Sequence, residues 1–125
     1  MDKIPVIAIV DDDQSAREGI VDLLSSMGFE AQGFERAEDV LRSQQIARAD
    51  CLITDVRMPG MNGLELLDRL LAAGRSIPAI VLTAFTLEAD RARALGAGAV
   101  CYMSKPVYES ELMKCIGAAL SSGSR

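Results

Sequence analysis

The chain has 125 residues, the size of a single domain, and half of them are hydrophobic while a quarter are charged. This composition is ordinary for a globular protein that buries a core. The net charge of −5 argues against a chain that by itself binds nucleic acid or an anionic membrane, because both need a basic surface. The absence of histidine excludes Ser-His-Asp and Cys-His nucleophile systems and His-ligated zinc.

The sequence also bears on compartment and cysteine chemistry. No apolar run approaches the length needed to span a bilayer, and residues 1–5 lack the features of a signal peptide. We therefore expect a cytoplasmic protein. Cys51, Cys101 and Cys115 each lie within an apolar segment, so we expect small buried hydrophobic side chains rather than disulfides or metal ligands.

The first half of the chain alternates between strand-like and helix-like segments. Residues 6–10 form a short apolar run that is typical of a strand buried on both faces. Apolar residues then recur at spacings of three and four over residues 16–27, which predicts a helix that ends at Gly28. Residues 29–34 predict a second strand, and residues 37–45 predict a short helix.

The alternation continues to the end of the chain. Residues 51–54 predict a third strand, and the Pro and Gly content of residues 57–63 indicates a loop. Further segments alternate as helix, strand, helix, strand and helix. They are a helix lined by Leu64, Leu67, Leu70 and Leu71 that ends near Gly74, then residues 79–82, 88–95 and 99–103, and a helix with apolar residues from Leu112 to Leu120.

Five strands that alternate with five helices predict an α/β fold. Such a chain forms right-handed crossovers and a parallel sheet with helices on both faces. We expect one domain over residues 1–120, with residues 121–125 as a flexible tail or the start of a linker. The helix over residues 88–95 is rich in alanine, so it buries little area and is expected to be weakly held.

Acidic side chains follow two of the predicted strands. Asp11, Asp12 and Asp13 come directly after the first strand, and Asp55 follows the third. Because the carboxyl ends of parallel strands share one edge of the sheet, Asp11, Asp12 and Asp55 are expected to converge there. Clustered carboxylates repel one another, so they either keep a proton or recruit a hard cation. These residues can also cap the first helix, and that reading is favoured for Asp13.

Two more polar residues fall at the same predicted edge. Thr83 ends the fourth strand, and Lys105 follows the fifth. Alone, Thr83 is typical of a strand-end hydroxyl bonded to backbone, and Lys105 of a surface charge. Beside three acids, they supply a hydroxyl donor and a fixed cation, which with a carboxylate nucleophile and a divalent-cation site are the components of phosphoryl transfer.

Several short segments follow one another in a recognisable order. They are Asp11-Asp12, Asp55 with Met58-Pro59-Gly60-Met61-Asn62-Gly63, Thr83-Ala84, Gly98-Ala99, Tyr102 and Lys105-Pro106. In these segments, and over essentially its whole length, the chain resembles the response-regulator receiver domain of two-component signalling. The segments around Asp55 and Lys105 look most like receivers that head LuxR-type transcription factors. The resemblance implies a flavodoxin-like, doubly wound sheet with strand order 2-1-3-4-5.

The resemblance also implies a phosphoacceptor and a metal site. Asp55 would accept a phosphoryl group from a histidine kinase. Asp11, Asp12 and Asp55, with the backbone carbonyl of Arg57, would hold Mg²⁺, which suits ligation by oxygen atoms. The only catalysis expected is of the domain's own phosphorylation and dephosphorylation, so the chain is not an enzyme in the usual sense.

Three further roles follow from the same resemblance. Lys105 would pair with a phosphoryl oxygen, and Thr83 and Tyr102 would act as the switch that senses the phosphoryl group. Tyr102 taken alone is an ordinary half-buried strand aromatic. The switch would shift the face formed by the fourth helix, fifth strand and fifth helix, and so control dimerisation or an output domain with a transcriptional role.

Two alternatives belong to other functional classes. A Mg²⁺-dependent phosphohydrolase with an aspartyl nucleophile typically has a second Asp two residues further on, where this chain has Arg57. A receiver-like interaction module that works without phosphorylation has usually lost an acid, the Thr or the Lys, and this chain retains them all.

Overall fold

The computed structural model describes residues 3–123 of the chain, and its five strands form one parallel sheet. Strand β1 (Val6–Val10) pairs with β2 (Glu30–Phe34) on one side and with the central strand β3 (Cys51–Thr54) on the other. Beyond β3 lie β4 (Ala79–Thr83) and the edge strand β5 (Ala99–Ser104). The order is therefore β2-β1-β3-β4-β5, as the resemblance implied.

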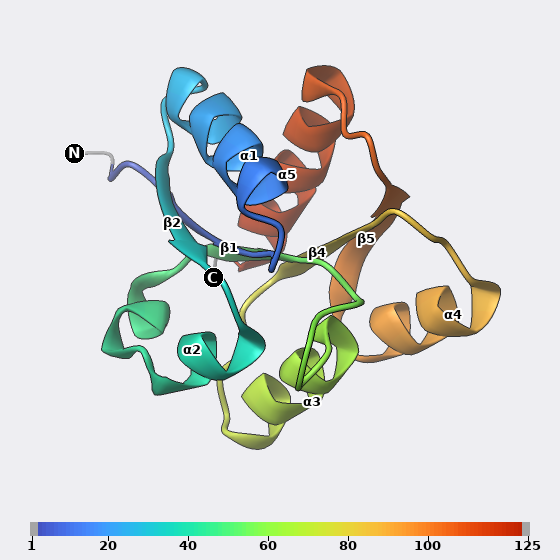
Figure 1. Ribbon diagram of the computed structural model, residues 1–125. Helices are drawn as coiled ribbons and strands as arrows, with labels where there is room; N and C mark the ends of the chain where they lie inside the picture. The colour runs from blue at the N-terminus through green and yellow to red at the C-terminus, as the bar shows by residue number, and fades with distance from the viewer. Residues whose placement is uncertain (1–2, 124–125) are drawn as a thin grey trace.

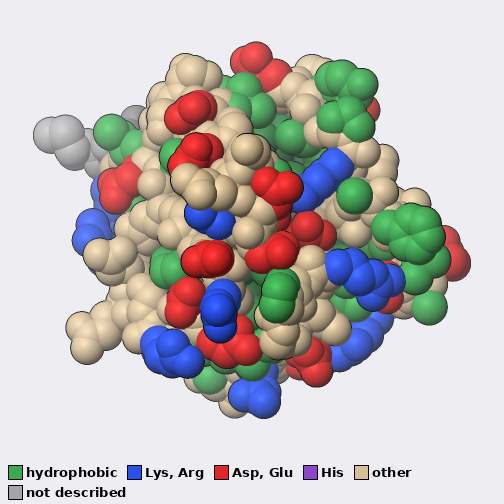
Figure 2. Space-filling model, viewed as in Figure 1, with side chains coloured by type: hydrophobic (Ala, Val, Ile, Leu, Met, Phe, Trp, Pro, Cys, Tyr) green, Lys and Arg blue, Asp and Glu red, His purple; other side chains and the backbone are tan. Residues whose placement is uncertain are grey.

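Helices cover both faces of the sheet, as the alternating sequence predicted. Helices α1 (Gln14–Ser26) and α5 (Glu109–Gly123) lie together on one face, while α2 (Ala37–Arg42), α3 (Gly63–Ala72) and α4 (Glu88–Gly96) cover the other (Figure 1). The space-filling view of the same side shows acidic side chains gathered near its middle, with basic side chains beside them (Figure 2).

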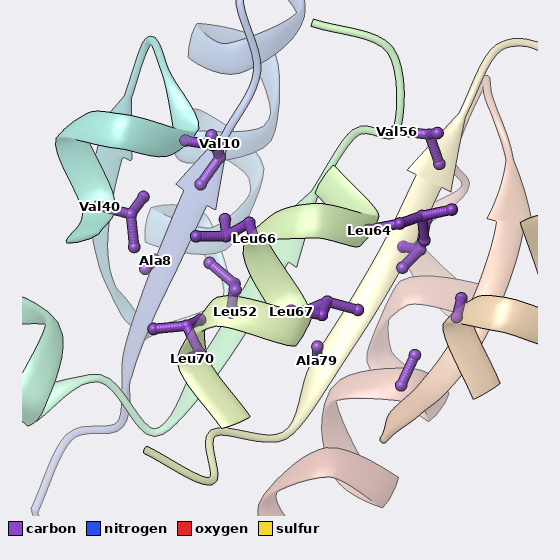
Figure 3. Packing of buried hydrophobic residues seen from close by; sticks show 14 of the residues in the cluster. Ala8, Val10, Val40, Leu52, Val56, Leu64, Leu66, Leu67, Leu70 and Ala79 are labelled. Atoms are coloured by element: carbon purple, nitrogen blue, oxygen red, sulfur yellow. The ribbon is translucent and has the colours of Figure 1, made fainter. Parts of the chain in front are cut away.

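The core consists of two apolar layers, one on each face of the sheet. Side chains alternate along β1, so that Ala8 and Val10 point to one layer while Ile7 and Ile9 point to the other. Figure 3 shows the first layer, in which α3 packs its leucines against the sheet. All residues of β1, β3 and β4 are buried, which confirms that their continuous apolar runs are strands covered on both faces.

Several element boundaries differ from those predicted. The helix expected over residues 37–45 breaks at Ser43, whose side chain accepts a hydrogen bond from the Gln45 backbone N–H and starts a 3-10 helix, Gln44–Arg48. Leu71, expected in the buried stripe of α3, is half exposed. Helix α5 continues to Gly123, while residues 124–125 of the predicted tail lie outside the described residues.

The expectation for two of the three cysteines was wrong. Cys101 of β5 and Cys115 of α5 form a disulfide, because their Cα atoms lie 6.1 Å apart across the packed strand and helix. Cys51 is fully buried in β3, as expected for a small hydrophobic side chain.

Within residues 3–123, none of the helices combines the length and the apolar character that crossing a membrane requires.

Candidate functional site

The register of the sheet brings three carboxylates together at its carboxyl edge. Val10 of β1 lies opposite Thr54 of β3, so the next residues, Asp11 and Asp55, leave the sheet side by side. Their main chains remain tied to neighbouring strands, since the Asp55 N–H donates to the Val10 carbonyl at 3.1 Å. One carboxylate oxygen from each of Asp11, Asp12 and Asp55 lies within 4.8 Å of the others. The predicted convergence of these three acids is therefore present.

Lys105 bridges two of the acids. Its Nζ donates to Asp11 Oδ2 at 2.6 Å and to Asp55 Oδ2 at 3.0 Å. The backbone holds the lysine in place, because its N–H donates to the Thr83 carbonyl at 2.9 Å. The peptide bond between Lys105 and Pro106 is cis. Burial lowers the pKa of Lys105, but the hydrogen bonds and charges of Asp11 and Asp55 outweigh it, so the pKa is raised overall and the ammonium stays charged.

The donor set fits a magnesium ion. Three carboxylates face one ammonium, which leaves the cluster with excess negative charge. All ligand atoms of the cluster are oxygens, the type that Mg²⁺ prefers. The three carboxylate oxygens lie within 4.8 Å of one another, near enough to share one ion. Asp12 is exposed, so water can complete the coordination sphere that Mg²⁺ usually retains.

Asp55 is held in one orientation. Its Oδ1 accepts a hydrogen bond from the Val56 N–H at 2.7 Å, while Oδ2 faces Lys105. The main-chain carbonyl of Asp55 accepts from the Thr54 hydroxyl at 2.9 Å. The Asp55 side chain is mostly buried, but 12% of it remains exposed to solvent.

Gly63 has a positional role that the sequence did not reveal. It is the first residue of α3, and a Cβ there would overlap the Asp55 carbonyl oxygen and come within 2.9 Å of the Thr54 hydroxyl. The helix starts at this point because Asn62 and Glu65 form a reciprocal capping box. The available signal was Asn62-Gly63 followed by Glu65; Asn62-Gly63 was interpreted as part of a loop and of the family-like segment, without its capping role.

The Asp13 side chain is not part of the cluster, although its backbone N–H donates to Asp11 Oδ1 at 3.0 Å. Its side chain accepts a hydrogen bond from the Ala16 N–H at 3.1 Å and so caps α1. The capping interpretation of Asp13 is therefore confirmed.

Thr83 and Tyr102 both contact the loop between β4 and α4. The buried Thr83 hydroxyl bonds to the backbone of Phe85, at 3.3 Å from its nitrogen and from its oxygen. The Tyr102 hydroxyl accepts from the Leu87 N–H at 3.1 Å and lies 3.4 Å from the Leu87 carbonyl. Neither hydroxyl bonds to an acid of the cluster. Instead, both hold the segment that leads into α4.

Helix α4 is attached to the rest of the domain mainly by ion pairs at its exposed surface. Ala94 is its one buried residue, in keeping with the weak packing expected from its composition. Two ion pairs of 2.9 Å join it to the rest of the domain, Arg57 to Asp90 and Arg93 to Asp68. Exposed ion pairs stabilise by about 0–1 kcal/mol each, so α4 is loosely held. The side chain of Arg57 is thus directed to α4, while its main chain lies two residues after Asp55.

Comparison with known proteins identifies the family. The model of the response regulator receiver domain matches residues 7–117. The chain belongs to the response-regulator receiver domain family. The response regulator protein TodT of Pseudomonas putida is 37% identical over 119 residues, which are 95% of this chain and 52% of TodT. The transcriptional regulatory protein FixJ of Bradyrhizobium diazoefficiens is 32% identical over 91% of this chain and 56% of FixJ.

Solved structures agree with the sequence relatives. The crystal structure of FixJ-N has a TM-score of 0.87 at 32% identity, covering 97% of this chain and 96% of that one. The response regulator StyR has a TM-score of 0.88 at 38% identity, covering 97% of this chain and 61% of that one. The chain spans about half the length of the curated relatives it matches, and two of these, TdiR of Thauera aromatica and FixJ, are transcriptional regulatory proteins by name. The likeness to receivers of transcription factors is confirmed.

Proposed function

We propose that this receiver domain is the phosphoacceptor switch of a two-component system and that Asp55 receives the phosphoryl group from a histidine kinase in the cytoplasm. The observation that supports the proposal most directly is the Lys105 ammonium, which lies 2.6 Å from Asp11 and 3.0 Å from Asp55. This arrangement puts a fixed positive charge beside a nucleophilic carboxylate and beside an acidic pair suited to a hard cation.

In the proposed reaction, a carboxylate oxygen of Asp55 attacks phosphorus. The new bond is a mixed anhydride, and the bond from phosphorus to the donor breaks, with its electron pair leaving on the donor. The Val56 N–H fixes the orientation of the carboxylate. Lys105 can pair with a phosphoryl oxygen, so it neutralises charge that develops there.

The residues proposed to hold Mg²⁺ are Asp11, Asp12, Asp55 and the main-chain carbonyl of Arg57. Bound there, Mg²⁺ would offset the repulsion between the acids and the incoming phosphoryl oxygens. Asp11 is 2% exposed and pairs with Lys105. Its proposed role is to hold the Lys105 ammonium beside the metal site.

The switch is proposed to run through the loop between β4 and α4. When the Thr83 hydroxyl turns toward a phosphoryl group on Asp55, its bonds to Phe85 are lost. Tyr102 then turns inward and releases Leu87, which removes a second attachment of this loop. Because α4 is weakly held, the loss of these two attachments is enough to move it.

The moved face is proposed to control dimerisation or an output domain with a transcriptional role. It consists of α4, β5 and α5. Large hydrophobic side chains are exposed there at Leu95 and Met113, a feature of surfaces that bind other proteins. With a net charge of −5, the domain itself is not proposed to bind nucleic acid or membrane.

The kinase is proposed to dock beside the site, in a hollow of about 540 Å³ between α1 and the segment after β5. Small and apolar side chains form its floor, among them Ala16, Gly19 and Ile20 of α1 and Pro106. Glu18 and Asp22 are exposed charged residues of the same helix. An apolar hollow on a helix that also carries exposed charges fits an amphipathic helix of the kinase that carries the phosphohistidine.

Gly19→Gln is expected to block the kinase without harming the fold. A Cβ at Gly19 meets nothing within 4 Å, and glutamine favours helix more than glycine does, so the added side chain fills only the docking hollow. The rate is measured with the histidine kinase that phosphorylates the wild-type domain fastest. We expect phosphotransfer from that kinase to Gly19→Gln to be slower by about tenfold or more. Phosphorylation by acetyl phosphate should be unchanged.

Gly117→Gln on α5 is the matched control, since a Cβ there also meets nothing within 4 Å and the residue lies away from the hollow. Equal transfer rates for the Gly19 variant, its control and the wild type would show that the kinase docks elsewhere.

The proposed function itself is tested by intact-mass spectrometry after incubation with acetyl phosphate, with and without Mg²⁺. We expect one phosphoryl adduct that requires Mg²⁺ and is absent from Asp55→Asn. Asp22→Asn, on the exposed surface of α1, is the control and should be phosphorylated like the wild type. Absence of the adduct from wild type in saturating Mg²⁺ would favour an interaction module that works without phosphorylation.

A further inference from the structure

The disulfide between Cys101 and Cys115 joins two elements of the face formed by α4, β5 and α5, which is called the output face because it is proposed to control the output. Cys101 lies in β5, the strand at the edge of the sheet, and Cys115 lies in α5, 14 residues further along the chain. Both side chains belong to the apolar layer between the sheet and α5. The bond therefore adds a covalent attachment where α5 is otherwise held by packing, mainly of Leu112, Ile116 and Ala119.

This pair lies nearer to the surface than the third cysteine, although Cys115 itself is only 7% exposed. Cys115 borders a surface hollow of about 390 Å³, together with Met103, Ser104, Glu111 and Lys114. Cys101 is half-buried on the edge strand. Cys51, by contrast, is fully buried, and burial raises the pKa of its thiol to about 12, so it remains an unreactive thiol.

We propose that Cys101 and Cys115 are a reversible redox-modification site, and that their oxidation state sets how far the α4–β5–α5 face can respond to a phosphoryl group on Asp55. Disulfides of cytoplasmic proteins are mostly transient and redox-sensing, so a pair at this position fits regulation better than permanent structure. The link to Asp55 and the cytoplasmic setting rest on the proposed function, while the thiol–disulfide chemistry of the pair does not.

The oxidant is a low-molecular-weight disulfide. The thiolate of Cys115, at the hollow, attacks one sulfur of that molecule and expels its other half as a thiolate, which leaves a mixed disulfide on Cys115. The thiolate of Cys101 then attacks the Cys115 sulfur and expels the second half. Two electrons pass from the cysteines to the small disulfide, and the two cysteine protons end on the two small thiols. Two molecules of the small thiol reverse both steps and regenerate the small disulfide.

Oxidation should stiffen the attachment of α5. Closing a loop of this length by a disulfide stabilises a domain mainly by restricting its unfolded chain, and the thermal midpoint should rise by on the order of 10 °C. In the reduced form, α5 depends on packing alone, so its amides should exchange with deuterium on the order of tenfold faster.

The test equilibrates the whole chain in buffers with graded ratios of reduced to oxidised glutathione. Thiols are then trapped with an alkylating agent in denaturant and located by peptide mass spectrometry. We expect Cys101 and Cys115 to lose and regain alkylation together, as an intramolecular disulfide, while Cys51 stays alkylated throughout. Cys101→Ser and Cys115→Ser should each lose the change in thermal midpoint that glutathione causes in wild type.

The second arm measures deuterium exchange of α5 with and without acetyl phosphate, in both oxidation states. Phosphorylation should change exchange in α5 several-fold more in the reduced chain than in the oxidised chain. Independent alkylation of the two cysteines at every ratio overturns the redox site, and an equal response in both states overturns its control of the output face. If Asp55 takes no phosphoryl group, the proposed function fails, and the alkylation result still decides whether the pair is reversible.

Discussion

Gly63→Ala is expected to lower the free energy of unfolding by about 3 kcal/mol, at the upper end of the usual cost of overpacking. The added methyl group would overlap the Asp55 carbonyl oxygen, and a main-chain atom cannot move aside as the end of a long side chain can. The Gly63 N–H also donates to the Val56 carbonyl at 2.9 Å, so a shift of α3 disturbs the residue whose N–H orients the Asp55 carboxylate. We therefore expect phosphorylation by acetyl phosphate to slow as well.

Denaturant unfolding of Gly63→Ala beside Gly117→Ala measures the first effect. Both changes add the same methyl group within a helix, but a Cβ at Gly117 meets nothing within 4 Å. The Gly117 variant should gain up to about 1 kcal/mol, because alanine favours helix more than glycine does. If the two variants have equal midpoints, close approach of α3 to Asp55 is not what requires glycine at this position.

The fold was predictable because its strongest signals are local. The runs that became β1, β3 and β4 are continuously apolar, and the glycines expected to end α1 and α3, Gly28 and Gly74, have positive φ angles of 93° and 78°. Once parallel strands were inferred, the meeting of Asp11 with Asp55 followed from their positions after β1 and β3. The acidic part of the candidate site could therefore be predicted without knowing how the side chains pack.

Other features depend on distances that no local pattern encodes. An apolar segment around each cysteine suits a buried thiol as well as a disulfide, and only the packing of α5 on β5 sets Cys101 beside Cys115. The pairing of Arg57 with Asp90 likewise joins residues 33 positions apart. For Thr83, the sequence placed the hydroxyl at the correct edge, but its present partner is the backbone of Phe85 and not the acidic cluster.

Lys105→Met is expected to weaken the apo domain and nearly abolish phosphorylation. The Asp11 side chain is 3% exposed and Asp55 12%, so removing the ammonium leaves two close carboxylates without their common partner. Breaking a fully buried pair costs about 3–5 kcal/mol, and partial exposure of Lys105 reduces this to about 2 kcal/mol. Loss of a fixed charge beside developing phosphoryl oxygens should slow acceptance by about a hundredfold. Unfolding curves and intact-mass time courses measure the two effects, with Lys114→Met on the surface of α5 as control.

The dependence of stability on Mg²⁺ and on pH tests whether Lys105 stabilises the domain through its charge or through its packing. Mg²⁺ supplies the missing positive charge, so it should stabilise the Lys105 variant more than the wild type, by the linkage between binding and folding. The pKa of Lys105 is raised above its ordinary value of 10.5 in the folded chain. The stability that the ammonium contributes is therefore fully present below that value and lost as the pH rises through the raised pKa. The difference in free energy of unfolding between wild type and variant should be constant near neutral pH and should disappear in strong alkali. A gap that persists there, or that Mg²⁺ does not narrow, would mean that the Lys105 side chain contributes through its aliphatic packing rather than through its charge.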